Sequence, residues 1–550
     1  MTAEKAIQLA EQMKSDFAPR ANAFELCRRY GYQMRKNGTA TYQNDKSDTL
    51  SPVLSSIPAT LAMRLAMYLH ANTLGVGNVF FALVAEPKDP NAVIPQADKD
   101  FVRNQSSRVL HRLFDTNFSS ETNVAFNDLT VVGNNITRCE FNEDLNTFEF
   151  KSFPVGDGVY LGENSRGQRD MFCRYFKYDA KQAKQEFGDD AGARVDAVLA
   201  GQGNGTESFE YMWLVYPRAV FKEEIGDGRG KKVPDTKKAF GSIIIDMSER
   251  RIVRESGYDE FPFAAPTWLR RGGSIYGYGP IEASIADIID LFELKYLKKK
   301  AVRKQVQPPL VVSSLWEGIN TDENEVNYVE GEVANQFASL PVPTSTPILN
   351  EEIAECIQNI KMNLMLDAFE TLTDHKNNMT TAEINGRIGQ SVRAIAPIVA
   401  RLHKEYFSPL IKRVFNIMVE RGEIELPSSV TPDMVSIKYV SVLDSLILQG
   451  ESAKMLEFIG SVMNLIQARG GLGEEFDCYL NMERILTHLS DYFNVPTDVV
   501  RESKVVAGML DALQKQRAAL QEAQIKAQAI KPIDMQKRAQ PGAPLAVQNF

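Results

Sequence analysis

The sequence lacks the features that mark three common classes of protein. No run approaches the roughly 20 apolar residues that a membrane-spanning helix needs. The opening MTAEKAIQLAEQMKSD does not have the pattern of a signal peptide. A basic surplus is missing too, because 62 Lys and Arg stand against 71 Asp and Glu, a net charge of −9. Proteins that grip nucleic acid usually carry a basic footprint, so we expect neither a membrane partner nor tight nucleic-acid binding.

Cysteine is scarce, and its arrangement argues against a disulfide framework. The 550 residues contain five cysteines, an odd number, and they lie far apart. Such spacing predicts reduced, mostly buried thiols in a protein made in the cytoplasm. They are Cys27, Cys139, Cys173, Cys356 and Cys478.

The motifs of common catalytic and metal sites are missing as well. The sequence has no Gly-x-Ser-x-Gly elbow and no His-Glu-x-x-His. The stretch 226–232, GDGRGKK, hints at a phosphate-binding loop. However, Ile225 and Lys232 occupy the places where that pattern needs glycine and Ser or Thr, so we predict a hairpin tip. No two histidines have ligand spacing on one element, and we expect no catalytic residue, metal or cofactor. The histidines are His70, His111, His375, His403 and His488.

The length predicts three or four domains or subdomains, because 550 residues exceed what one core can bury. Residues 1–278 read as mixed α and β around a small sheet, with a polar loop over 36–50. In the apolar helix 57–74, Met63, Leu65, Met67 and Leu69 are predicted to be core. Helices are expected over 3–36, 57–74, 98–118 and 179–200, and strands over 129–132, 147–153, 159–161, 209–216, 240–246 and 251–255.

Residues 279–305 predict a long helix with plain start and stop signals. Gly279 is the cap, Pro280 takes the first helical position and Glu282 lies in the first turn. Acidic residues fill its first half and basic residues its second, which suits the helix dipole. Its apolar stripe is expected to be buried partly between neighbouring copies, through Ile288 and Phe292. The basic residues are Lys295, Lys298, Lys299, Lys300, Arg303 and Lys304.

Two further helices are predicted downstream. Asn350 caps one that runs to residue 370. A polar loop follows, and a capping box from Thr380 to Glu383 then starts a third helix that ends at Gly422. Pro397 and Pro409 lie inside this third helix and predict kinks. The polar loop comprises Asp374, His375, Lys376, Asn377 and Asn378.

The insertion 306–349 is acidic, with no Lys or Arg at all. Apolar pairs at 311–312 and 328–329, with Val326, suggest short strands, and Pro341, Pro343 and Pro347 keep its exit extended. A solvated acidic loop is one interpretation, and a docking surface is the other. Its carboxylates are Glu317, Asp322, Glu323, Glu325, Glu330 and Glu332.

Beyond Gly422 the pattern is helical again, over 433–447, 451–468, 476–493 and 498–526. The prolines and polar residues of 531–550 predict a disordered tail.

This order of helix, acidic insertion, helix, polar loop and long kinked helix resembles the core of phage portal proteins. More narrowly, the chain is similar to the head-to-tail connectors of short-tailed, podovirus-type phages. The residues that carry the resemblance are SIYGYGPIE at 274–282 and MTTAEI at 379–384, with weaker support from 123–134 and 49–75. Order and spacing carry the match, which reaches from about residue 20 to 425; no single motif does.

The resemblance implies a mainly α fold with a smaller α+β part, assembling as a ring of twelve subunits. The implied parts are a wing (1–278), a stem helix (279–305), a clip (306–349), a second stem helix (350–370), a tunnel loop (371–380), a long kinked wing helix (381–425), a helical crown (426–530) and the tail (531–550). The clip carboxylates would dock partners. The loop 374–378 would project into the channel, although a plain inter-helix turn could look the same.

The implied function is a channel at one capsid vertex for packaging and ejecting double-stranded DNA. Implied partners are the terminase motor, major capsid and scaffolding proteins, and tail adaptors, with assembly in the host cytoplasm before incorporation into the virion. Two alternatives stay open. Another virion scaffold or tail-adaptor protein would lack this helix order, and a packaging ATPase would need a phosphate-binding loop, which is not found.

Overall fold

A computed structural model describes most of the first 440 residues and a few beyond them. The described ranges are 1–32, 34–35, 49–50, 55–74, 79–87, 94–156, 158–201, 207–226, 234–306, 310–312, 337–339, 346–373, 391 and 394–440, together with isolated helical positions between 458 and 520. The chain divides into two compact units, Met1–Ile447 and Leu448–Phe550. In the second unit, residues 458–461, 464, 485, 509, 515–516 and 520 are helical.

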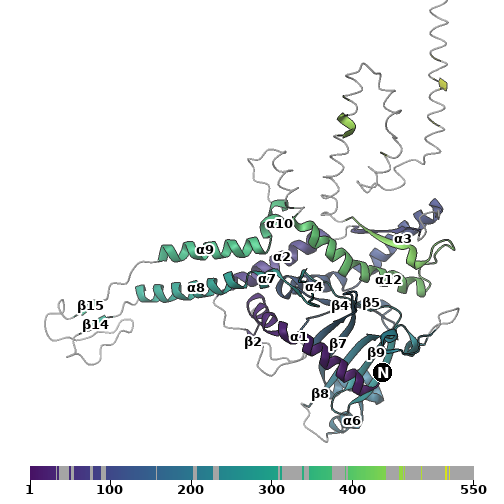
Figure 1. Ribbon diagram of the computed structural model, residues 1–550, viewed down its shortest axis with the longest axis horizontal. Coiled ribbons are helices and arrows are strands. Elements are labelled where there is room, and N and C mark those ends of the chain that lie inside the picture. The colour runs from purple at the N-terminus through teal and green to yellow at the C-terminus, as the bar shows by residue number, and fades with distance from the viewer. Residues whose placement is uncertain are drawn as a thin grey trace, which may run out of the picture. The chain divides into compact units, whose positions relative to one another are not determined.

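Four helices open the first unit (Figure 1). They are α1 (Ala3–Gly31), α2 (Ile57–Thr73), α3 (Gln96–Phe114) and α4 (Phe118–Val132). The first three confirm the predicted helices, except that α1 ends before residue 36. Met34–Arg35, predicted to be helical, form the strand β1, which pairs with β2 (Thr49–Leu50) in the predicted loop. In α2, Leu65 and Leu69 are buried, but Met63 and Met67 are half-exposed, so their assignment to the core was wrong. Only the face of α2 that carries Leu65 and Leu69 packs into the core, and the two methionines lie on the opposite, exposed face.

The segment 129–132 forms the last turn of α4 and is not the predicted strand. Leu-Thr-Val-Val has high strand propensity, yet Phe118, Phe126 and Leu129 are all buried along one helix. Burial of that stripe outweighs the local propensity of four residues. Gly133 then ends the helix with φ +73°, a left-handed conformation that glycine adopts without strain.

The sheets follow α4 in the chain. A five-stranded antiparallel sheet has the order β10-β9-β8-β7-β6, and a three-stranded sheet has the order β11-β4-β5. Five predicted strands are confirmed, β5 and β9 with the predicted bounds, whereas β4, β7 and β11 were missed. The bounds are β4 (Ile136–Asn142), β5 (Thr147–Phe153), β6 (Val159–Glu163), β7 (Arg169–Asp179), β8 (Ser208–Pro217), β9 (Phe240–Asp246), β10 (Arg251–Tyr258) and β11 (Phe263–Ala264).

Aromatic rings join these two sheets. Phe172 of β7 stacks on Phe263 of β11 at 4.0 Å between centroids, and the Trp213 ring lies 5.1 Å from Phe172. Phe153 of β5 lies 5.7 Å from Phe172. These rings are buried, and each aromatic pair adds roughly 0.5–1.5 kcal/mol to the effect of burial alone.

The predicted helix 179–200 is interrupted. Asp179 and Gln182 form a capping box that starts α5 (Ala180–Phe187). Gly188 and Gly192, both with positive φ, break the helix, and α6 (Ala193–Leu199) follows. Most of the predicted loop 36–50, and residues 227–233 of the predicted hairpin tip, lie outside the described residues.

The long helix near the end of the unit contains a π-helical turn. Residues 394–402 are α-helical, His403–Phe407 form the π turn, and α12 (Ser408–Glu420) completes the helix. Pro409 lacks the amide hydrogen that would bond to residue 405, so the wider turn just before it relieves the clash expected from proline. The kink predicted at Pro409 therefore takes this form. Gly422, with φ +74°, follows the helix end as predicted.

One helix predicted near residue 440 is wrong. Residues 433–447 contain the strand β16 (Val435–Tyr439), which pairs antiparallel with β3 (Phe81–Ala85). Period-3.6 and period-2 patterns are hard to separate over five residues, and the pairing partner lies far away in the sequence. Residues 441–447 lie outside the described residues.

A buried polar cluster fixes α1 against α4. The Tyr32 hydroxyl donates to Asp128, and the Asn135 amide donates to the other Asp128 oxygen at 2.9 Å. The Thr137 hydroxyl in turn donates to Asn135 at 2.8 Å. Burial is the main cause that raises the pKa of Asp128 above 3.8, although both hydrogen bonds oppose it.

Replacement of Asp128 by Asn should remove one source of pH dependence in stability. Because the pKa is raised on folding, the folded chain holds this proton more tightly than the unfolded chain. The contribution of Asp128 is therefore largest below the unfolded pKa and falls as pH rises toward the folded pKa. We expect the difference in unfolding free energy, wild type minus D128N, to decrease from pH 4 upward. Urea titrations followed by tryptophan fluorescence measure it, and a flat difference would contradict the assignment.

Candidate functional site

The candidate site is a helical hairpin. It begins with α7 (Pro280–Ala283), continues through α8 (Ile285–Val306) and returns along α9 (Thr346–Asn363). Gly279 caps α7 and Pro280 follows, as predicted. At 1.5 Å per residue, α8 is about 33 Å long. Figure 1 shows α8 and α9 side by side. Between them in the chain, the strands β14 (Leu310–Val312) and β15 (Phe337–Ser339) pair antiparallel.

The two helices differ from the prediction at their ends. A short break at Ser284 separates α7 from α8. The return helix starts at Thr346, not Asn350, so Pro347 lies in its first turn, where proline is tolerated. It ends at Asn363, and α10 (Leu366–Thr373) follows after Met365, whose φ is +53°. β14 confirms the strand predicted at 311–312; β15 was missed.

The half of the hairpin nearest the sheets is packed within the chain. Ile288 and Leu291 of α8 are fully buried, as are Ile360 and Leu364 at the end of α9. Asp287 accepts hydrogen bonds from the amides of Asn359 and Asn363, at 3.4 and 3.3 Å. The expectation that Ile288 lies between neighbouring copies was wrong, because its own chain covers it completely.

Phe292 also packs within its own chain. Its ring lies 4.9 Å from the ring of Tyr30 in α1. The base of the hairpin also meets α2 through α10, where Phe369 stacks on Tyr68 at 6.2 Å and Arg64 pairs with Glu370 at 3.1 Å.

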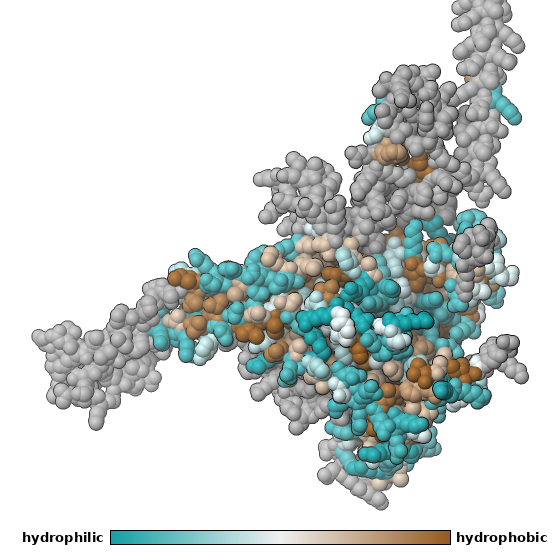
Figure 2. Space-filling model, in the orientation of Figure 1, coloured by the Kyte–Doolittle hydropathy of each residue, from teal (hydrophilic) through white to brown (hydrophobic). Residues whose placement is uncertain are grey.

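The far half of the hairpin exposes large apolar side chains. Leu297 is 50% exposed and Val306 75%, and Ile348 near the start of α9 is 64% exposed. Tyr296 and Val302 are also exposed. Figure 2 shows this apolar surface interleaved with polar surface along the hairpin. Exposed apolar clusters of this kind mark interaction surfaces in soluble proteins.

Cations crowd the same half. Lys295 donates to the Ser55 hydroxyl at 2.7 Å, and burial, followed by the charges of Lys298 and Lys299, lowers its pKa. The Lys300 ammonium lies 5.0 Å from the centre of the Tyr296 ring. The structure therefore gathers the six predicted cations on the last three turns of α8, where the helix dipole favours positive charge. Those on the exposed surface are Lys299, Lys300, Arg303 and Lys304.

An ion pair anchors the base of the hairpin. Arg20 of α1 donates to both oxygens of Glu282 in α7, at 2.9 and 2.6 Å. Both side chains are mostly buried, which strengthens a bidentate pair. Arg20 also donates to the Gly277 carbonyl at 3.3 Å, and the Asn134 amide group exchanges two hydrogen bonds with Gly277.

Two glycines allow the end of α4 and the start of α7 to touch. A β-carbon on Gly133 would lie 2.3 Å from the Gly279 nitrogen, and one on Gly279 would lie 2.8 Å from the Gly133 nitrogen. At both positions the nearest neighbouring atoms belong to the backbone, so a side chain larger than hydrogen does not fit at either glycine.

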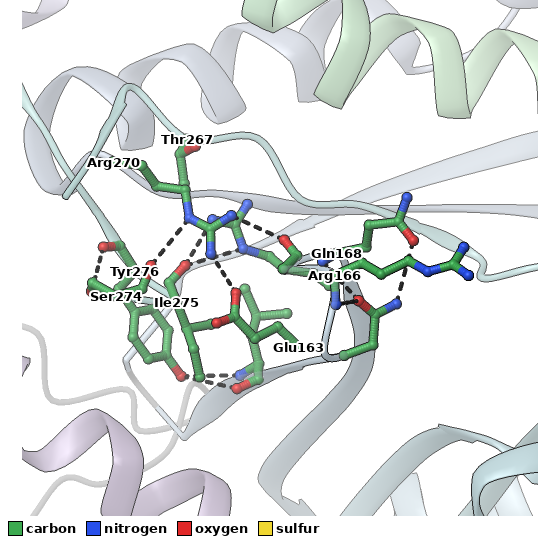
Figure 3. Close-up of polar contacts among 12 residues, drawn as sticks. Glu163, Arg166, Gln168, Thr267, Arg270, Ser274, Ile275 and Tyr276 are labelled. Carbon is green, nitrogen blue, oxygen red and sulfur yellow. Dashed lines mark hydrogen bonds and ion pairs between the residues drawn. The ribbon is translucent and has the colours of Figure 1, made fainter. Parts of the chain in front are cut away.

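The segment leading into α7 is fixed by two arginines, of which Figure 3 labels Arg270. Arg270 donates to the Ser274 and Gly167 carbonyls, at 3.1 and 3.0 Å, and pairs with Glu163. Arg169 donates twice to the Ile275 carbonyl, at 3.2 and 2.7 Å. Its burial lowers the pKa to about 10, so it remains charged at neutral pH.

The other predicted site residues lie outside the described part of the chain. These are the loop 374–378 and the carboxylates between 317 and 332. The exposed apolar residues of the hairpin were missed by sequence reasoning. A helical projection of 285–306 would have shown Leu297 and Val302 outside the predicted stripe and among lysines.

Within the described residues, no group of three or more His, Cys, Asp or Glu side chains could hold a metal ion. Three of the thiols there are buried: burial raises the pKa of Cys27 and of Cys139 to about 12 and raises that of Cys173 as well. In the same part of the chain, none of the helices combines the length and the apolar character required to cross a membrane.

Comparisons with known proteins give one consistent result. The model of the family described as "Bacteriophage head to tail connecting protein" matches residues 3–500. The portal protein of Salmonella phage epsilon15 is 25% identical over 426 residues, which cover 74% of this chain and 73% of that protein. The probable portal protein of Bordetella phage BPP-1 is 25% identical over 380 residues, covering 68% and 66%.

Replacement of Glu282 by Ala should loosen the base of the hairpin. The change leaves the mostly buried Arg20 without its carboxylate, at a cost of about 2 kcal/mol. That cost corresponds to about thirtyfold faster amide hydrogen exchange in peptides spanning 280–290. Glu293→Ala on the exposed side of α8 is the matched control and should change exchange little. Equal protection in the two variants would show that the pair does not hold the hairpin.

Proposed function

Because the chain belongs to the family of bacteriophage head to tail connecting proteins, we propose that it forms the portal at one vertex of the capsid. In this role it provides the channel through which viral double-stranded DNA is packaged and later ejected. The observation that carries the proposal is the family match, which extends over residues 3–500 and agrees with two relatives described as portal proteins. The role is structural and not catalytic.

Twelve subunits would suit such a channel. Twelve helices about 10 Å wide, set side by side in a ring, give a circle of about 120 Å through the helix axes. That circle is about 38 Å across, and subtracting one helix width leaves an opening about 28 Å in diameter. Groove depths of about 8.5 and 7.5 Å make a DNA duplex about 20 Å wide, so it fits with room for water and ions. We assign the stem to α8 and α9, since they form the longest paired helices outside the sheets (Figure 1). The wing is then 1–278. The crown is assigned to 426–530, apart from β16, which pairs with β3 of the wing.

The surface chemistry of the stem supports both sliding and assembly. The total charge of −9 per chain, multiplied around a ring, repels phosphates and discourages tight binding of DNA. The six cations of α8 would supply one local positive belt. Leu297, Val302 and Ile348 are exposed in the single chain, and we assign them to the contact between neighbouring subunits.

Partner binding is assigned to the clip. The sequence placed the clip at 306–349, and the ends of α8 and α9 narrow it to 307–345. Its carboxylates at 317, 322, 323, 325, 330 and 332 would dock the terminase motor during packaging and tail adaptors afterwards. Contacts of this kind are electrostatic and weaken with salt. Major capsid and scaffolding proteins would surround the ring in the virion, after assembly in the host cytoplasm.

Negative-stain microscopy tests the ring. The wild-type protein should give rings with a central hole, which neither a filamentous scaffold nor a monomeric adaptor would form. Leu297→Asp should reduce rings at least tenfold in size-exclusion chromatography with light scattering, because each subunit contact would then bury a charge in an apolar surface. Leu145→Asp is the matched control, since Leu145 is 72% exposed at a turn between β4 and β5. Intact rings from L297D would remove this face from the subunit contact.

Deletion of 374–378 tests the tunnel-loop assignment. A loop in the channel would carry His375 and Lys376 where they can touch phosphates and hold packaged DNA. Rings and thermal stability should remain close to wild type, while heads should lose genome. DNA content and leakage from mature heads measure the effect, and replacing His375 and Lys376 by Ser is the milder variant. Full heads with wild-type retention would mean that the segment is only a turn.

A further inference from the structure

Three cations gather where the two sheets of the first unit meet. Arg138 of β4 and Lys151 of β5 are direct cross-strand partners. Arg174 of β7, on the larger sheet, lies over the same Phe153 ring as Lys151. Like charges directly opposite each other destabilise an antiparallel pair. Such a pair needs a compensating charge.

Arg174 has no such compensation among the described residues. It is only 7% exposed. Its guanidinium lies 4.9 Å from the centre of the Phe153 ring and 4.8 Å from that of Phe176, stacked against two aromatic rings. Its buried Nε has no hydrogen-bond partner, and no described carboxylate pairs with the side chain. Cation–π contacts offset the charge but do not satisfy the Nε hydrogen.

The other buried arginines of the described chain behave differently. Arg218 pairs with Glu223 at 2.9 Å and donates to the Ser256 carbonyl at 3.2 Å. Arg413 donates to the Cys139 carbonyl at 2.7 Å. Arg218 shares an unpartnered Nε with Arg174. Of these three arginines, however, only Arg174 pairs with no described carboxylate, an exception to the rule that buried charges are paired.

The surroundings of Arg174 are positive. The Lys151 ammonium lies 5.9 Å from the centre of the Phe153 ring, the same ring on which Arg174 stacks. Arg138 lies over Trp213 at 5.3 Å, and Trp213 is the cross-strand partner of Arg174. Glu140 pairs with Arg138 at 2.9 Å, yet the Arg138 Nε is buried without a partner.

The pKa of Lys151 responds to the same positive charges. Shielding of its amino group lowers the pKa first, and the charges of Arg174 and Arg138 lower it further. Glu149 and Glu121 act in the opposite direction but do not reverse the shift. Lys151 is itself an exposed residue, so an ion in solution can reach its ammonium group.

We propose that Arg174, Lys151 and Arg138 form a binding site for an oxyanion, a carboxylate or phosphate group supplied from outside this chain. The two rings fix the plane of the Arg174 guanidinium, which leaves its edge to donate paired hydrogen bonds to such a group. Lys151 adds a mobile positive charge at the exposed side. The site does not depend on the proposed channel function.

Equilibrium dialysis of the full-length protein with radiolabelled inorganic phosphate, at constant ionic strength, tests the site. The wild type should bind about one phosphate per subunit, as expected for one anion shared by three cations. Arg174→Met should weaken binding more than tenfold, since charge-assisted hydrogen bonds contribute about 1.5–3 kcal/mol. Lys151→Met, a change at an exposed position that preserves folding, should weaken it about threefold through the lost charge.

Arg254→Met is the matched control. Arg254 lies over the Phe187 ring at 5.7 Å, as Arg174 lies over its rings, but it pairs with Glu186 at 2.8 Å. Its replacement should leave phosphate binding unchanged. The proposal is overturned if the wild type binds no phosphate, if K151M and R174M both bind like the wild type, or if R254M loses as much binding as they do.

Competition by acetate separates the two sources of the oxyanion. If acetate displaces phosphate from the wild type but not the weak phosphate binding that remains in R174M, the site is assigned to carboxylates. Acidic side chains of another protein would supply such groups. Phosphate binding that acetate does not affect assigns it to phosphate groups.

Discussion

The contact between Gly133 and Gly279 is the constraint on which the arrangement of the first unit depends. Backbone touches backbone there, so the end of α4 and the start of α7 are fixed relative to each other without any side chain between them. The ion pair of Arg20 with Glu282 and the hydrogen bonds of Asn134 to Gly277 close around the same point. The direction of the α8–α9 hairpin is therefore set at its base. Its far half is free to present apolar and basic side chains.

Much of this arrangement could be predicted where the signal is local. The cap at Gly279, the strands β5 and β9 and the basic end of α8 each depend on a few consecutive residues. Errors occurred where distant partners decide. Val435–Tyr439 is a strand because β3 pairs with it, and 129–132 is helical because the buried face of α4 continues through it. Ile288 looked available on its own helix, but α9, which is distant in sequence, helps to cover it.

The π turn at His403–Phe407 shows how one residue type shapes a distant contact. Pro409 requires the wider turn, and the turn carries Glu405, which accepts hydrogen bonds from the backbone and hydroxyl of Thr267 at 2.9 Å each. Arg401, one turn earlier, donates to the Trp268 carbonyl at 3.0 Å. The long helix therefore holds the segment that leads to α7, and proline in it contributes to the position of the hairpin.

The pairing of β3 with β16 has a consequence for how the chain folds during synthesis. The two strands are separated by about 350 residues, and ribosomes add about 5–20 residues per second. β3 therefore waits about 18–70 s before its only strand partner in the described structure leaves the ribosome. Through that interval Phe81 and Leu83, both buried in the finished fold, belong to a strand that has no pairing partner. Folding of this protein thus includes a long-lived nascent state with one exposed apolar strand, the kind of edge that chaperones shield in cells.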